Sequence, residues 1–135
     1  MLGDYRIRKQ IGKGAFGSVY KCINTKNLRV FAIKTIYIRK MNKQQRKDVE
    51  SEVNLLASLP THKNIVQYID TVNTQRFFCI VLEYVGLGSL KKVIQDVGSP
   101  GLEEQMMASF IGQILSGLQF LHEQGLIHRD VKAVE

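Results

Sequence analysis

Apolar and polar residues alternate near the start of the chain, which is the pattern of β-strands with one buried face. Tyr5, Ile7 and Ile11 fall on one side of the first such segment, and arginine and glutamine side chains occupy the other. Ser18–Ile23 and Val30–Ile36 are two further strand-like segments, the latter rich in β-branched residues. Their short connections favour an antiparallel meander.

The period of the pattern then changes to that of an α-helix. Valine and leucine recur at helical spacing across Lys43–Leu59, and Pro60 follows as a helix terminator. Two more strands are predicted over Ile65–Val72 and Phe77–Tyr84, separated by a polar turn. This part of the chain therefore predicts five strands with one inserted helix.

Helical patterns dominate after the glycine-containing breaker Gly86-Leu87-Gly88. Ser89 is placed to cap a short helix, and a longer helix is expected over Glu103–His122 with Gly125 at its end. The chain is thus predicted to be α+β, with an antiparallel sheet first and helices after it.

Composition narrows the class of protein. The 135 residues include 19 Lys and Arg against 12 Asp and Glu, a net charge of +7, with the densest basic run from Arg39 to Lys47. No nucleic-acid motif accompanies this run, so a solvated basic face is favoured over a surface for nucleic acid or anionic lipid. Cys22 and Cys79 lie in separate strand-like runs, which predicts buried thiols in a reducing compartment. Since no apolar run resembles a signal peptide or a membrane span, an intracellular, cytoplasmic protein without a membrane partner is expected.

A glycine-rich string joins the first two predicted strands. Gly12–Val19 reads Gly-Lys-Gly-Ala-Phe-Gly-Ser-Val, and glycines let backbone N–H groups approach phosphate oxygens. The main alternative is a dinucleotide-binding turn, which needs a helix after the glycines and an acid about 20 residues further on. Here a strand-like run follows Gly17 and no acid stands at that distance, so a phosphate-covering loop between antiparallel strands is favoured.

Lys34 lies in the third predicted strand, at the end of the run Phe-Ala-Ile-Lys. Strand alternation places Ala32 on the same face, where a small side chain can lie against a flat base. An ammonium within an apolar strand is expected to need an anion, because burying it without a partner is costly. Glu52, beside Val53 on the predicted helix, is the candidate partner, and the alternative is that Glu52 is one more surface acid.

A series of short motifs extends this pattern through the chain. They are Ile11–Val19, Phe31–Lys34, Glu52, His62-Lys63-Asn64-Ile65-Val66, Val81-Leu82-Glu83-Tyr84, Gly88-Ser89-Leu90 and His128-Arg129-Asp130-Val131-Lys132. In this order and spacing they resemble the protein kinases over about residues 5–133, and the last motifs are similar to the sterile-type group of MAP-kinase-kinase-kinases and septation kinases. The resemblance implies a kinase N-lobe at residues 1–85, which binds ATP, and the start of the helical C-lobe at residues 86–135.

The resemblance further implies a serine/threonine protein kinase domain that transfers the γ-phosphate of ATP, with Mg²⁺, to a protein substrate. Val19 and Ala32 would line the adenine slot beside the gatekeeper Leu82, while the Glu83 carbonyl and the Val85 N–H would bond the adenine edge. The nucleotide-binding residues implied in full are Ile11, Gly12, Lys13, Gly14, Ala15, Phe16, Gly17, Ser18, Val19, Ala32, Lys34, Glu52, Leu82, Glu83, Val85 and Ser89.

Asp130 resembles the catalytic aspartate, which orients the substrate hydroxyl and accepts its proton. Lys132 is typical of serine/threonine kinases at this spacing and implies contact with the γ-phosphate, and Lys34 completes the implied catalytic set. Arg129 would receive a phosphorylated activation loop. The partners implied are ATP and a protein substrate or another protein of a kinase pathway.

The family pattern places a metal-binding Asn five residues after the catalytic Asp, where this chain has Glu135. The resemblance stops at Ala133, so no metal ligand is assigned, and the chain is expected to be a fragment that is inactive alone. The alternative is a non-catalytic nucleotide-binding or decoy module, similar to a pseudokinase. Without partners, the long helix is expected to expose Met107, Phe110, Ile114 and Leu118.

Overall fold

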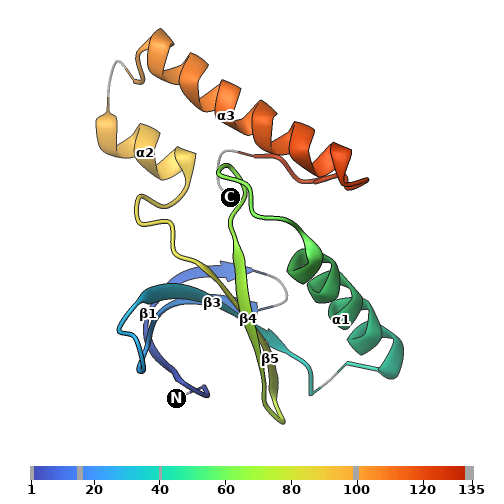
Figure 1. Ribbon diagram of the computed structural model, residues 1–135. Helices are drawn as coiled ribbons and strands as arrows, with labels where there is room; N and C mark the ends of the chain where they lie inside the picture. The colour runs from blue at the N-terminus through green and yellow to red at the C-terminus, as the bar shows by residue number, and fades with distance from the viewer. Residues whose placement is uncertain (1, 15–16, 40, 99–100, 133–135) are drawn as a thin grey trace. The chain divides into compact units, whose positions relative to one another are not determined.

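Five strands form one antiparallel sheet in the spatial order β1-β2-β3-β5-β4 (Figure 1). The computed structural model describes residues 2–14, 17–39, 41–98 and 101–132. Its elements are β1 (Tyr5–Gly14), β2 (Gly17–Asn24), β3 (Val30–Tyr37), α1 (Lys43–Ser58), β4 (Tyr68–Asn73), β5 (Phe77–Glu83), α2 (Leu90–Val97) and α3 (Glu104–Glu123). The predicted α+β class, with five antiparallel strands and a helix after the third, is confirmed.

The chain divides into two compact units. One comprises Met1–Pro60 with Val66–Tyr84 and contains the whole sheet and α1. The other comprises Thr61–Ile65 with Val85–Glu135 and contains α2 and α3. None of the helices in the described ranges combines the length and the apolar character needed to span a membrane.

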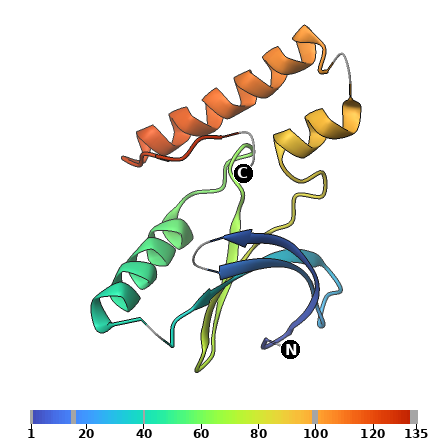
Figure 2. The same cartoon turned by 180° about the vertical axis from the view of Figure 1, so that it is seen from behind.

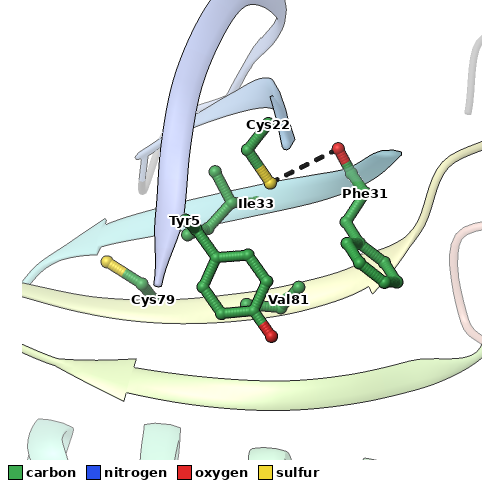
Figure 3. Close-up of a cluster of buried hydrophobic side chains, with 6 residues drawn as sticks. All are labelled: Tyr5, Cys22, Phe31, Ile33, Cys79 and Val81. Atoms are coloured by element: carbon green, nitrogen blue, oxygen red, sulfur yellow. Dashed lines mark hydrogen bonds between the residues drawn. The ribbon is translucent and has the colours of Figure 1, made fainter. Parts of the chain in front are cut away.

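A cluster of buried side chains fills one face of the sheet. Ile33 of β3 and Val81 of β5 are direct cross-strand partners, and neither is accessible to solvent. Such a pair of buried aliphatic side chains stabilises the fold by removing apolar area from water. The cluster consists of Tyr5, Cys22, Phe31, Ile33, Cys79 and Val81 (Figure 3). The predicted burial of both cysteines is confirmed.

The opposite face of the sheet packs against α1, which lies beside β4 in both views of the molecule (Figures 1 and 2). Val53 is the buried residue of this helix. It forms a second cluster with Ile36 of β3 and with Phe78 and Ile80 of β5. Because β3 and β5 contribute apolar residues to both faces, they are the centre of the fold.

Local chemistry sets both ends of α1. The Asn42 side chain accepts a hydrogen bond from the Gln45 N–H at 2.8 Å, and the Gln45 side chain accepts one from the Asn42 N–H at 3.0 Å. This capping box satisfies two N–H groups that the first helical turn would leave unpaired. At the other end Leu59 is extended, with φ −67° and ψ 133°, because the residue before Pro60 is disfavoured in helical geometry.

The fourth strand begins later than its pattern predicts. Ile65–Val72 reads as one strand, but β4 starts at Tyr68, so the prediction for its first residues is wrong. The Ile65 N–H donates to the His62 carbonyl at 3.1 Å in a turn. Ile65 faces Gly117 of α3, where a Cβ would lie 3.3 Å from its side chain. The apolar side chain of Ile65 therefore packs against a helix and does not indicate a strand.

Each helix of the second unit has an identifiable cap. The Ser89 hydroxyl accepts from the Lys92 N–H at 3.3 Å, which confirms the predicted N-cap of α2. After α3, Gly125 takes φ 74°, and the Leu126 N–H donates to the Leu121 carbonyl at 2.9 Å. This is a Schellman ending, in which glycine adopts the left-handed conformation without a Cβ penalty.

Side chains on α3 are only partly covered. Met107 is 44% exposed and Ile114 is 40% exposed, as predicted, whereas Phe110 and Leu118 are half-buried, contrary to the prediction. Ile111 and Leu115, which the sequence did not single out as exposed, are 56% and 59% exposed. Apolar side chains that stay in water at these positions do not contribute the free energy that their burial would provide.

Candidate nucleotide-binding site

The glycine string joins two strands of one antiparallel hairpin. Gly14 of β1 is the register partner of Gly17 of β2, and Gly12 pairs with Val19. A strand follows Gly17, whereas a dinucleotide-binding turn would have a helix there, so that alternative is excluded. The predicted loop residues Ala15 and Phe16 lie outside the described residues.

Gly17 is required to be glycine by a backbone contact. A Cβ at this position would lie 1.7 Å from the Thr35 carbonyl oxygen and 2.9 Å from its carbon. Atoms at that separation overlap, so any side chain would push β2 and β3 apart. A Cβ at Gly12 would instead meet the Val19 side chain at 3.5 Å, which is ordinary contact.

Four of the predicted nucleotide-binding residues share one face of the sheet. Val19 of β2 is the register partner of Lys34 of β3, and Ala32 is the partner of Leu82 of β5. Cross-strand partners project to the same face, and residues two apart on a strand do so as well. The prediction that Ala32 and Lys34 share a face is therefore confirmed.

The polarity of this face changes over a short distance. Ala32 is 8% exposed and Leu82 is half-buried, so these positions are apolar and covered. Lys34, two residues along β3, is exposed. The face thus combines a small apolar surface with the cations Lys34 and Lys21, the latter being the register partner of Ala32, and the glycine hairpin forms its neighbouring edge.

The predicted ion pair between Lys34 and Glu52 is not formed. Both residues are exposed, and neither takes part in an ion pair with any residue that the structure describes. The helical position next to Glu52 belongs to Val53, which turns into the sheet and leaves the acid toward water. A solvated ammonium needs no anion, so the premise that Lys34 is buried was wrong.

The end of β5 is held by neighbours that the sequence did not indicate. The Glu83 N–H donates to the Gln67 carbonyl at 2.9 Å, and its carboxylate accepts from the Gln67 N–H at 3.3 Å. The Lys21 ammonium of β2 lies 4.9 Å from the centre of the Tyr84 ring, which is a cation–π contact. Val85 and Ser89, the next predicted residues, belong to the second unit.

The segment from His128 to Lys132 has its own internal contacts. The Lys132 ammonium lies 2.7 Å from an Asp130 carboxylate oxygen, and the Asp130 N–H donates to His128 Nδ1 at 3.3 Å. Arg129 has φ 65°, a left-handed conformation that is uncommon outside glycine. The structure thus brings the predicted catalytic residues Asp130 and Lys132 together, while Glu135 lies outside the described residues.

Neither cysteine has the properties of a reactive or metal-binding thiol. Burial raises the pKa of Cys22 to about 11 and that of Cys79 to about 11, so both stay protonated near neutral pH. The Cys22 thiol donates to the Phe31 carbonyl at 3.4 Å (Figure 3). Across the part of the chain that is described, His, Cys, Asp and Glu form no group of three or more that would hold a metal ion.

Comparisons with known proteins identify the family. The family described as "Protein kinase domain" matches residues 5–134. MAP3K epsilon protein kinase 1 of Arabidopsis thaliana is 41% identical over 98% of this chain and 9% of its own length. Cell division control protein 7 of Schizosaccharomyces pombe is 41% identical over 90% of this chain and 11% of its own. Cytokinesis protein sepH of Aspergillus niger is 38% identical over 97% of this chain and 10% of its own.

The chain therefore spans about a tenth of the length of these relatives. The matched segment includes both the glycine hairpin and the His128–Lys132 segment described above. Several of the most similar relatives are named as protein kinases, among them serine/threonine kinases. On this evidence the chain belongs to the protein kinase family, whose members are phosphotransferases.

Proposed function

We propose that this chain binds ATP on the sheet face that carries Val19, Ala32, Lys34 and Leu82, as the nucleotide-binding part of a serine/threonine protein kinase. The strand register carries this proposal, because it brings these four side chains to one face beside the glycine hairpin. The opposite face of the sheet, in the described residues, holds the apolar cluster around Ile33 instead.

The parts of this face fit the parts of ATP. Val19, Ala32 and Leu82 offer apolar contact to a purine base. The Lys34 ammonium is exposed and in no ion pair within the described ranges, so its charge is available to a phosphate. At Gly17 the backbone is so close to β3 that a Cβ has no room, so this end of the glycine string lies directly against the strand that carries Lys34.

We propose separate roles for two residues of the second unit. Asp130 would orient the hydroxyl of a protein Ser or Thr and accept its proton. The contact of 2.7 Å with Lys132 would orient the Asp130 carboxylate. Both groups are exposed, so the contact itself adds little to stability. Their contribution would be to the reaction.

Kinases use Mg²⁺ to neutralise charge that develops on the transferred phosphate. The described residues do not fit this metal, since they contain no suitable group of His, Cys, Asp or Glu, and the position five residues after Asp130 holds Glu135. We therefore propose that a polypeptide of these 135 residues binds the nucleotide without completing the transfer. Measurable transfer that is lost on Asp130→Asn would refute this part of the proposal.

Thermal unfolding with and without nucleotide tests the binding. ATP that binds only the folded chain stabilises it by about 2.7 kcal/mol at 100 times its Kd. Lys34→Met should weaken ATP binding about tenfold or more while adenosine still binds, because a hydrogen bond to a charged group is lost. Lys47→Met, which removes an exposed lysine from α1, is the matched control and should behave as wild type. No shift with millimolar ATP would overturn the proposed function.

A second candidate function is a non-catalytic or decoy module that engages a kinase partner. The exposed apolar side chains of α3, including Ile111 and Leu115, favour it. A decoy should slow protein phosphorylation by an active kinase domain of the similar MAP3K epsilon type when added in excess. An unchanged rate would exclude the decoy and leave the nucleotide-binding proposal as it stands.

A further inference from the structure

Thr35 links the glycine hairpin to the strand that carries Lys34. It is the one polar residue among the described residues classed as buried, at 8% exposure. Its hydroxyl donates to the Ser18 carbonyl at 3.0 Å, and Ser18 is also its register partner on β2. The hydroxyl therefore makes a contact between strands in addition to their backbone ladder.

Gly17, the residue before Ser18, makes a second contact with Thr35. The backbone of Gly17 is so close to the Thr35 carbonyl that no Cβ fits between them. Thr35 thus meets the hairpin twice, through its side chain at Ser18 and through its backbone at Gly17. Both contacts fall on the β2 arm of the hairpin, Gly17–Val19, whose last residue is paired with Lys34.

The β1 arm of the hairpin is held differently. The pairing of β1 with β2 shifts register between Ile7 and Gln10 and again between Gln10 and Gly12. The pairing of β2 with β3 runs from Gly17 to Ile23 without a shift. Bulges interrupt the ladder and allow a strand to bend, so the two arms differ in how firmly the sheet holds them.

We propose that Thr35 is a positioning residue for phosphate binding: it fixes the β2 arm of the hairpin, Gly17–Val19, beside Lys34. This inference rests on the proposed binding of ATP. The physical reason is that phosphate oxygens must meet the Lys34 ammonium and the backbone N–H groups of the loop together. The β2 arm sets the distance between these two groups of donors.

The near-isosteric variant Thr35→Val removes the hydroxyl donor and keeps the methyl group, while Thr35→Ser keeps the donor. We expect Thr35→Val to weaken ATP binding about fivefold, the effect of one hydrogen bond, and to leave adenosine binding within about twofold of wild type. The backbone ladder still pairs Val19 with Lys34 in the variant, so the contact with the base is retained. Thr35→Ser should restore ATP binding.

Hydrogen exchange gives a readout that needs no nucleotide. In Thr35→Val the amides of the β2 arm should exchange about fivefold faster than in wild type, while the rest of the sheet keeps its protection. Thr71→Val is the matched control: it removes a hydroxyl bonded to Tyr68 at 2.7 Å in the same sheet, away from the hairpin. It should leave exchange of the arm and ATP binding unchanged.

The outcomes separate this inference from the function on which it rests. If wild type binds neither ATP nor adenosine, the proposed function fails, and the positioning role fails with it. If wild type binds both but Thr35→Val equals wild type, only the positioning role is overturned. If Thr35→Val weakened ATP binding and adenosine binding equally, or if amides exchanged faster throughout the sheet, the positioning role would be overturned as well. Both results are the effect of general destabilisation.

Discussion

The sheet and the long helix differ in what becomes of their apolar side chains. In the sheet, Ile33 and Val81 are completely inaccessible to solvent. On α3, Ile111 and Leu115 remain more than half exposed although they are aliphatic as well. Both regions have the period that predicts their secondary structure, so period alone does not decide burial.

The difference follows from how each element finds a partner. A strand in an antiparallel meander pairs with its neighbour across a short turn, and here β3 and β5 are covered on one face by the cluster around Ile33 and on the other by α1. A helix satisfies its own backbone and can form without covering its apolar stripe. The lesson is that a pattern predicts an element, whereas burial needs a second surface.

The largest expected effect tests this comparison directly. Ile33→Ala should lower the free energy of unfolding by about 2–5 kcal/mol, because it leaves a cavity in a core that is already closed. Leu115→Ala removes a similar side chain from an exposed position and should change it by less than about 0.5 kcal/mol. Urea unfolding followed by circular dichroism measures both. Similar losses in the two variants would mean that α3 is covered in solution.

A smaller effect is expected from the backbone contact at the glycine hairpin. Gly17→Ala should destabilise the sheet by about 1–3 kcal/mol, because the new Cβ overlaps the Thr35 carbonyl and the strands must shift. Gly12→Ala is the matched control in the other arm, where the Cβ meets only the Val19 side chain at an ordinary distance. Its stability should stay within about 0.5 kcal/mol of wild type.

Thermal and urea unfolding of both glycine variants give the measurement. Equal destabilisation by Gly12→Ala and Gly17→Ala would show that the two arms are held alike. That result would contradict the difference between the two arms that the strand pairing indicates.

Much of the sheet could be predicted because its signals are local. Strand alternation was sufficient to place Ala32 and Lys34 on one face, and the extended residue before Pro60 explains the end of α1. Capping follows the same logic, since Ser89 and Gly125 act on the backbone within a few residues of themselves. These features need no knowledge of what lies across the fold.

The features that could not be predicted depend on distant residues. The ion pair of Lys34 with Glu52 was expected from order along the chain, but the orientation of α1 is set by Val53, and the lysine stem carries its ammonium into water. Ile65 is not part of the strand predicted for it, because its side chain packs against α3 at Gly117. The hydrogen bond of Thr35 could not be predicted for the same reason, since its partner Ser18 lies 17 residues away.

The smallest expected effects come from substitutions at two glycines, one in the middle and one at the end of α3. Gly112 is exposed within the helix, and a Cβ there would meet nothing within 4 Å. Gly112→Ala should therefore stabilise the helix by about 1 kcal/mol, since alanine costs less backbone entropy than glycine. Gly125 has φ 74°, so Gly125→Ala should destabilise the helix by about 1 kcal/mol or slightly more.

Hydrogen exchange of the α3 amides measures both changes without unfolding the sheet. The opposite signs are the informative result, because both substitutions add the same methyl group to the same helix. If both variants slowed exchange, the left-handed Gly125 ending would not be the conformation in solution. If both accelerated it, the exposed side of α3 at Gly112 would be in contact with another surface, and the contrast between covered sheet and uncovered helix would have to be withdrawn.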